Sequence, residues 1–147
     1  MIMKKSTILI ALCFAALTAC DSGTSGEEET VSLEDKVMAI HDEAMAKMDN
    51  IYKLRRKLRT LRDTLEAQQA DSTMLLPLEQ EISGLNKADE AMMQWMRQYE
   101  APDTLQQEQA MQYLQQELKK IKRVQTMMDS TLEAAQITLT RYEQEQK

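Results

Sequence analysis

Residues 33–65 decide the fold, and they read LEDKVMAIHDEAMAKMDNIYKLRRKLRTLRDTL. Apolar side chains recur in this stretch at alternating steps of three and four residues, the spacing that places them on one face of an α-helix. Only Lys47 interrupts the series, and Met48 beside it covers the gap. The pattern predicts one long helix over about residues 32–69. Its apolar series is Leu33, Val37, Ile40, Ala44, Ile51, Leu54, Leu58, Leu61 and Leu65.

Two further helices follow from turn signals and from the same spacing. Helix-capping side chains occur at residues 70–73, ahead of Pro77, and at residues 101–104, which include Pro102. Capping side chains close to a proline are typical of turns between helices. These signals bound a second helix over about residues 73–100 and a third helix after it. Trp95 and its neighbours widen the apolar face of the second helix, which predicts that it is the middle helix. The third helix carries the series Met111, Leu114, Leu118, Ile121, Met128, Leu132, Ala135, Leu139 and Tyr142.

Composition agrees with long helices, because Gly (3) and Pro (2) are scarce and Met (12) is abundant. Short turns force neighbouring helices to run antiparallel, and a sustained 3.5-residue period favours knobs-into-holes packing. The sequence therefore predicts an all-α fold, an antiparallel up-down-up three-helix bundle with coiled-coil packing. A fourth helix would require a break at residues 129–131, against which the unbroken heptad phase argues. Gly84 marks either a break or a close helix contact.

The middle helix of this bundle is about ten residues shorter than its neighbours, so their ends should extend beyond it. At the end of the third helix this overhang would leave an apolar set exposed, which predicts a homo-oligomer formed through the overhangs. The set consists of Leu132, Ala135, Ile137, Leu139 and Tyr142.

The first twenty residues have the pattern of a targeting segment. Lys4 and Lys5 precede an apolar run at residues 8–17 that is too short to span a bilayer stably. The run ends in Leu-Thr-Ala-Cys at residues 17–20, which resembles the bacterial lipobox. The resemblance implies that residues 1–19 are removed as a signal peptide, that the Cys20 thiol carries diacylglycerol, and that the new amino terminus is open to acylation, for example by palmitate. The alternatives are an ordinary secretory signal with a free Cys20 and an uncleaved anchor.

The chain that follows this signal is acidic and leaves no thiol for a disulfide. Residues 20–31 hold the lipidated cysteine and small or acidic residues, which predicts a flexible tether ahead of a helical-bundle domain over residues 32–147. Cys13 leaves with the signal and Cys20 carries lipid, so no disulfide framework is expected. Removal of two of the 18 basic side chains, Lys4 and Lys5, moves the net charge from −6 to −8 and disfavours nucleic-acid binding.

The tether also bears on the choice of membrane. An acidic run after the lipid cysteine, here residues 27–29, resembles the export signal of Bacteroidota surface lipoproteins. An Asp directly after the cysteine, here Asp21, resembles the inner-membrane retention signal of enterobacteria. We expect a lipid-anchored protein of the bacterial cell envelope, at the outer rather than the inner membrane, facing the periplasm or the surface.

Basic residues are concentrated in two stretches of the acidic chain. If the first and third helices run parallel, counting along them places the two stretches at about the same height. The resulting belt would bind an anionic glycan, a lipid headgroup or the acidic face of a partner protein. The alternative is a solvated face whose cations pair with Asp and Glu. The stretches contain Lys53, Arg55, Arg56, Lys57, Arg59 and Arg62, and then Lys119, Lys120, Lys122 and Arg123.

Methionines and the single histidine form a second candidate site. The same counting places Met45 and Met48 level with Met92, Met93 and Met96 and near Met111, with His41 one to two turns away. Thioether and imidazole ligands suit copper, although Met also fills irregular gaps in helical cores. A third group, of carboxylates, differs from di-iron bundles because those require Glu-x-x-His pairs and the chain has one His. It consists of Asp42, Glu43, Asp49, Asp89 and Glu90.

Three short motifs resemble a family of short Bacteroidota lipoproteins. They are IHDEAM at residues 40–45, AMMQWMR at residues 91–97 and YL at residues 113–114, and the likeness extends over most of residues 37–135. Members of this family have no assigned activity, and some carry the label viral A-type inclusion protein. The resemblance implies a lipoprotein location and a helical fold class, and the motif around Trp95 is its most distinctive part.

The expected function is therefore non-enzymatic, with no cofactor: a lipid-anchored helical bundle that binds an envelope protein or an anionic polymer, or that serves a structural role. The second hypothesis is a copper-handling or other metal-handling lipoprotein that uses His41 and the methionines. Trp95 should be buried against a neighbouring helix near those methionines.

Overall fold

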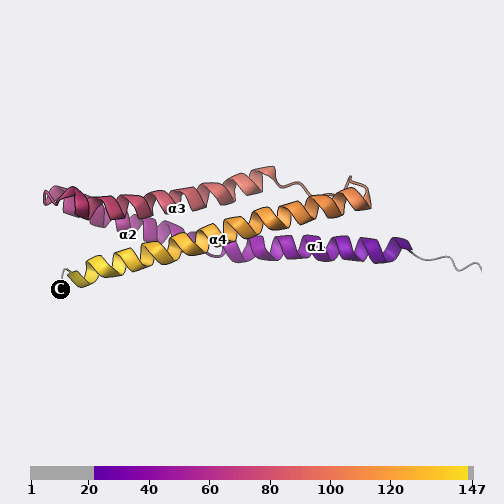
Figure 1. Cartoon of the computed structure of the whole chain (residues 1–147), viewed down its shortest axis with the longest axis horizontal. Coiled ribbons are helices and arrows are strands. Elements are labelled where there is room, and N and C mark those ends of the chain that lie inside the picture. Colours follow the sequence, from indigo (N-terminus) through magenta and orange to yellow (C-terminus); the bar gives the residue numbers. More distant parts are fainter. Residues whose placement is uncertain (1–21, 146–147) are drawn as a thin grey trace, which may run out of the picture.

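The computed structural model describes residues 22–145, with side chains from residue 26 onward. Within this range the chain forms α1 (Ser22–Met45), α2 (Met48–Ala67), α3 (Ser72–Gln98) and α4 (Gln107–Glu145), and it contains no strand. α1 and α2 follow one another in the same direction, α3 runs back beside them, and α4 returns along the whole bundle (Figure 1). The predicted all-α, up-down-up arrangement of three packed helical layers is confirmed.

The first layer is not the single helix that the spacing predicted, because it breaks at Ala46 and Lys47. The N–H of Lys47 donates to the carbonyl of Ala44 at 3.0 Å, a tighter turn than an α-helix makes, and regular bonding resumes where the N–H of Ile51 donates to Lys47. An unbroken helix would carry Lys47 into the apolar series. The break instead lets its ammonium reach Asp129 at the surface while Met48 is buried.

α3 begins at the turn that the sequence marked. The Asp71 carboxylate accepts a bond from the N–H of Thr73 at 2.7 Å and caps the helix. Further along, a Cβ added to Gly84 would lie 3.3 Å from Thr131 Cγ2 of α4, so of the two expectations for Gly84 the close helix contact is the one observed.

α4 is continuous, as the heptad phase predicted. The hydroxyls of Ser130 and Thr131 donate to the carbonyl of Met127 in the preceding turn, so they stay within the helix rather than capping a new one.

The hydrophobic core follows the predicted series of the first layer, whose members are all buried or packed against buried residues. In α4 the observed seam lies one residue before the predicted one at three positions. Ala110, Glu117 and Val124 are buried, whereas Met111 and Leu118 of the predicted series, and Gln125 at the position between Ile121 and Met128 that continues it, are half-buried. Ala110, Glu117, Val124 and Thr138 thus share one heptad position that faces the bundle.

The prediction that the end of α4 extends beyond the rest of the bundle is wrong. Ala135, Leu139 and Tyr142 are buried, and the Tyr142 hydroxyl donates to the carbonyl of Met74 near the start of α3. The first turns of α3 therefore lie level with the last turns of α4 and cover them. Of the predicted set only Ile137 is exposed, at 54%, while Leu132 is half-buried. Met74 and Leu76 of α3 are also exposed at this end, and oligomerisation stays a prediction.

At the opposite end, α1 begins earlier than the sequence predicted. Residues 22–31, expected to be part of a flexible tether, are helical, and the Thr30 hydroxyl donates to the carbonyl of Gly26 at 2.9 Å. This turn lies beside the start of α4, because a Cβ on Gly26 would collide with the side chain of Gln107. The signal peptide and Cys20 lie outside the described residues.

None of the four described helices combines the length and the apolar character that a bilayer-spanning helix requires.

Candidate functional site

The cations of α2 fall into two classes. Arg55 belongs to the packing between α2 and α3, because its guanidinium donates to Asp89 at 2.9 Å and to Asn86 at 3.0 Å and its side chain is 14% exposed. Lys53 and Arg62 pair with Asp49 and Asp63 on their own helix. These three residues match the alternative of a face with paired charges.

Arg56, Lys57 and Arg59 form the second class. All three are exposed, and none has a carboxylate partner within 4.0 Å among the residues whose side chains are described. Arg59 reaches only the amide of Asn86, at 3.5 Å. These three cations remain available to a ligand.

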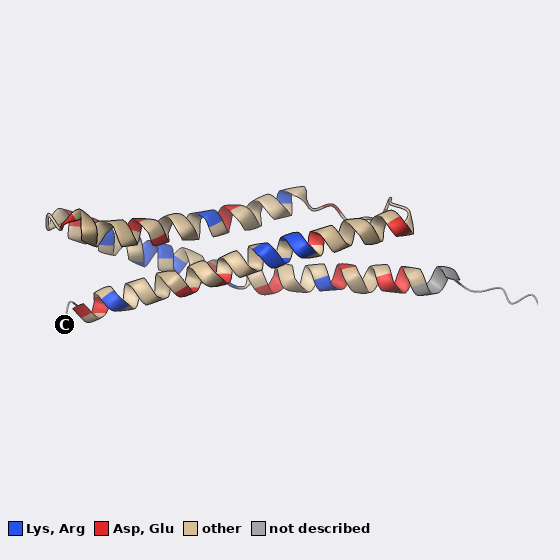
Figure 2. Cartoon of the chain, viewed as in Figure 1, with Lys and Arg blue, Asp and Glu red and all other residues tan. Residues whose placement is uncertain are grey.

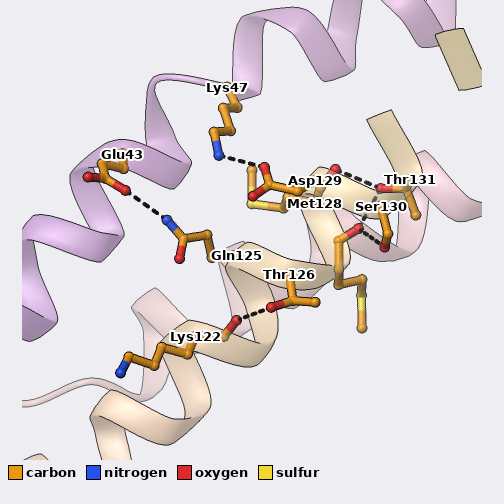
Figure 3. Close-up of polar contacts among 10 residues, drawn as sticks. Glu43, Lys47, Lys122, Gln125, Thr126, Met128, Asp129, Ser130 and Thr131 are labelled. Carbon is orange, nitrogen blue, oxygen red and sulfur yellow. Dashed lines mark hydrogen bonds and ion pairs between the residues drawn. The ribbon is translucent and has the colours of Figure 1, made fainter. Parts of the chain in front are cut away.

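The second basic stretch lies elsewhere on the bundle (Figure 2). Gln125 donates to Glu43 and Lys47 donates to Asp129, pairs that are each 82 residues apart in sequence (Figure 3). By this register Lys119–Arg123 lie level with residues 37–41 of α1, roughly 25–30 Å from the cations of α2. The predicted belt is not formed, because the connection at residues 99–106 is longer than the predicted turn and carries the start of α4 to the level of Gly26, near the start of α1.

A groove lies between α2 and α4, which diverge toward the α2–α3 turn (Figure 1). It consists of two adjoining hollows of ≈ 640 Å³ and ≈ 490 Å³ that share Arg56 and Lys57. Leucines form its floor, and charged side chains of α2 and α4 form its rims. We call it the α2–α4 groove; it is lined by Asn50, Lys53, Leu54, Arg56, Lys57, Thr60, Leu61, Thr64, Leu132, Glu133, Gln136, Leu139 and Glu143.

The methionine site is only partly assembled. Met48 and Met92 are buried near the break between α1 and α2, where the register places Met128 of α4 rather than Met111. Met93 is exposed, and Met45 and Met96 are half-buried against the core. The His41 ring lies tilted beside Trp95, with 5.4 Å between ring centroids, and its Nδ1 contacts Asp42 at 2.9 Å. Burial of these thioethers in the core matches the gap-filling alternative.

The predicted carboxylate group is not brought together. Each member has its own partner: Asp42 contacts His41, Glu43 accepts from Gln125, Asp49 pairs with Lys53, Asp89 with Arg55, and Glu90 with Arg97. Within the described residues, no group of three or more His, Cys, Asp or Glu side chains is arranged to hold a metal ion.

An aromatic cluster joins α1, α3 and α4 near the start of the bundle. Trp95 is 5% exposed and stacks on Tyr99 at 5.0 Å, so its predicted burial against a neighbouring helix is confirmed. The Tyr99 hydroxyl donates to Glu34 at 3.0 Å. Burial, together with this bond to a carboxylate, raises the pKa of Tyr99 well above its ordinary value.

Glu117 is the residue near this cluster that the sequence interpretation missed. Its side chain is 2% exposed; one carboxylate oxygen accepts from Lys120 at 2.6 Å, and the other has no partner among the described side chains. The available signal was Val124, which lies seven residues after Glu117 and shares its heptad position. Because the adjacent Leu118 is apolar, the predicted series placed Leu118 in the seam instead of Glu117.

Comparison with models of protein families, with curated proteins and with solved structures finds no match to this chain, so the resemblance to Bacteroidota lipoproteins stays a prediction.

Proposed function

We propose that this protein is a lipid-anchored, non-enzymatic binding module of the bacterial envelope that engages its partner through the α2–α4 groove. The observation that carries the proposal is the pair Arg56 and Lys57, which are exposed, have no carboxylate partner among the described side chains, and line both hollows of the groove. In a chain of net charge −6, cations left without partners beside an apolar hollow are the surface best suited to attract an acidic partner.

The groove lies far from the start of α1. α1 begins at Ser22, two residues after the proposed lipid site at Cys20, whereas the groove is lined by residues 50–64 of α2. At 1.5 Å per residue, the near edge of the groove is about 40 Å along the helices from the start of α1. Anchoring through Cys20 would thus present the groove well away from the lipid surface.

The anchor is tested with Cys20→Ser in cells that are fed an alkyne analogue of palmitate. We expect the variant to lose the lipid label, and to leave the membrane fraction or to accumulate as an unprocessed precursor. Label equal to that of the unmodified chain would refute lipidation at Cys20.

The binding surface is tested with a photo-crosslinking residue at Thr60, an exposed position on the groove wall. We expect a discrete adduct in cells that is lost in Arg56→Gln/Lys57→Gln. Lys119→Gln/Lys122→Gln is the matched control, because it removes the same charge from exposed sites outside the groove. Equal loss in both variants would show that net charge, and not the groove, controls binding.

A further inference from the structure

We infer that the α2–α4 groove receives one amphipathic helix of a partner protein, with the acidic side of that helix against α2. This inference rests on the proposed function and names the class of its partner.

The length of the groove fits a short helix. Its lining extends over residues 50–64 of α2 and residues 132–143 of α4. At 1.5 Å per residue these stretches are roughly 16–21 Å long, the length of a helix of about three to four turns. α2 and α4 are both helices, so a third helix laid between them would meet two ridged walls of the kind that helix packing requires.

The floor of the groove is apolar. Leu54 and Leu139 are buried at its base, and Leu61 and Leu132 are half-buried along it. Because the bundle already covers Leu54 and Leu139, the apolar surface open to an occupant is that of Leu61 and Leu132. An occupant that covers this surface must present an apolar stripe, and in a helix such a stripe recurs at steps of three and four residues. A glycan or a lipid headgroup would satisfy the cations but would leave Leu61 and Leu132 partly exposed.

The two rims carry opposite charges. On the α2 side stand Lys53, Arg56 and Lys57, and on the α4 side stand Glu133 and Glu143. Because Lys53 already pairs with Asp49, Arg56 and Lys57 are the cations left for the occupant. The complementary helix therefore has acidic residues on one flank of its apolar stripe, facing Arg56 and Lys57, and neutral or basic residues on the other.

Shape argues against a second copy meeting groove to groove. A two-fold contact of this face would place hollow against hollow, and neither surface would fill the other. A single convex helix fills the space between α2 and α4.

The test uses the full chain in lipid nanodiscs and two fluorescent peptides of 18 residues and equal composition. One peptide is an amphipathic helix with a leucine stripe and glutamates on one flank; the other is scrambled to remove the stripe while keeping its charge. Fluorescence anisotropy should show at least tenfold tighter binding of the amphipathic peptide. Arg56→Gln/Lys57→Gln should weaken this binding several-fold, and sodium chloride should weaken it further.

Two variants probe the groove itself. Leu61→Gln should reduce binding at least tenfold, whereas Leu76→Gln is the matched control on α3, 53% exposed and outside the groove. Thr60→Arg fills the groove from an exposed wall position and gives the same result without changing a core residue. Circular dichroism checks that each variant keeps its helices.

Three outcomes overturn the inference. If both peptides bind equally and only the charge variant weakens them, the groove is a surface for anionic polymers and the proposed function survives. If neither peptide binds and sedimentation shows a dimer that Thr60→Arg disrupts, the occupant is a second copy. If the amphipathic peptide binds but neither the charge variant nor the groove variants weaken it, the groove is not the binding surface, and the proposed function fails as well.

Discussion

Replacing Glu117 by Leu should make the protein more stable. Glu117 occupies a core-facing heptad position of α4, yet among the described side chains one of its oxygens has no partner and the other has only Lys120, whose side chain is about half exposed. Exchanging buried ion pairs for apolar residues of similar volume is often neutral or stabilising by about 1–4 kcal/mol. Because Lys120 is half exposed and partly hydrated, we expect the lower half of that range, about 1–2 kcal/mol.

Urea unfolding followed by circular dichroism measures this change as a shift of the midpoint at constant slope. Glu79→Leu, an exposed position on α3, is the control for added hydrophobicity. Lys120→Ala should destabilise the unmodified chain by about 1–3 kcal/mol, because it leaves the carboxylate buried alone, and should be nearly neutral in the Glu117→Leu background. A lower free energy of unfolding for Glu117→Leu would refute the reasoning, since the carboxylate would then gain more from its surroundings than its burial costs.

Three further predictions follow from packing and protonation. Trp95→Ala should cost about 3–5 kcal/mol in urea melts, and a cost below about 1 kcal/mol would contradict its stacking in the core. Because the pKa of Tyr99 is raised in the folded protein, its contribution to stability is complete below the unfolded tyrosine value of about 10 and is lost as pH rises through the folded pKa. The free energy of unfolding of Tyr99→Phe should therefore fall less steeply above pH 10 than that of the unmodified chain. Parallel pH profiles of the two proteins would contradict this. Gly84→Leu should cost about 1–3 kcal/mol in thermal melts, because its side chain would meet Thr131 across the α3–α4 contact, and an unchanged melting temperature would show that the helices separate freely.

Local patterning was enough to predict the helices and most of the core. The apolar series from Leu33 to Leu65 and the turn at Asp71 depend on spacing and capping, which are properties of neighbouring residues. Burial of Trp95 could be predicted for the same reason. The sequence also contained a signal for the break at Lys47, because a lysine within an apolar series requires either a break in the helix or a charged side chain in the core.

Features that depend on register between helices could not be predicted in this way. The choice between Glu117 and Leu118 is decided by which face α4 turns toward α1 and α3. The height of Lys119 relative to Arg56 depends on how far the chain travels between α3 and α4 before α4 begins at Gln107. The groove itself exists because α2 and α4 diverge, and the divergence of two helices cannot be predicted from the sequence of either helix alone.

The register between α1 and α4 also predicts an order of folding. Its contacts, Glu43 with Gln125 and Lys47 with Asp129, join residues 82 positions apart, whereas α2 and α3 are neighbours across a short turn. Local pairs close with less loss of chain entropy, so the hairpin of α2 and α3 should form first and α1 should wait for α4. During synthesis, α1 emerges before the other helices but cannot cover its apolar face until the last helix of the chain has been made. The helix beside the proposed anchor is thus completed last.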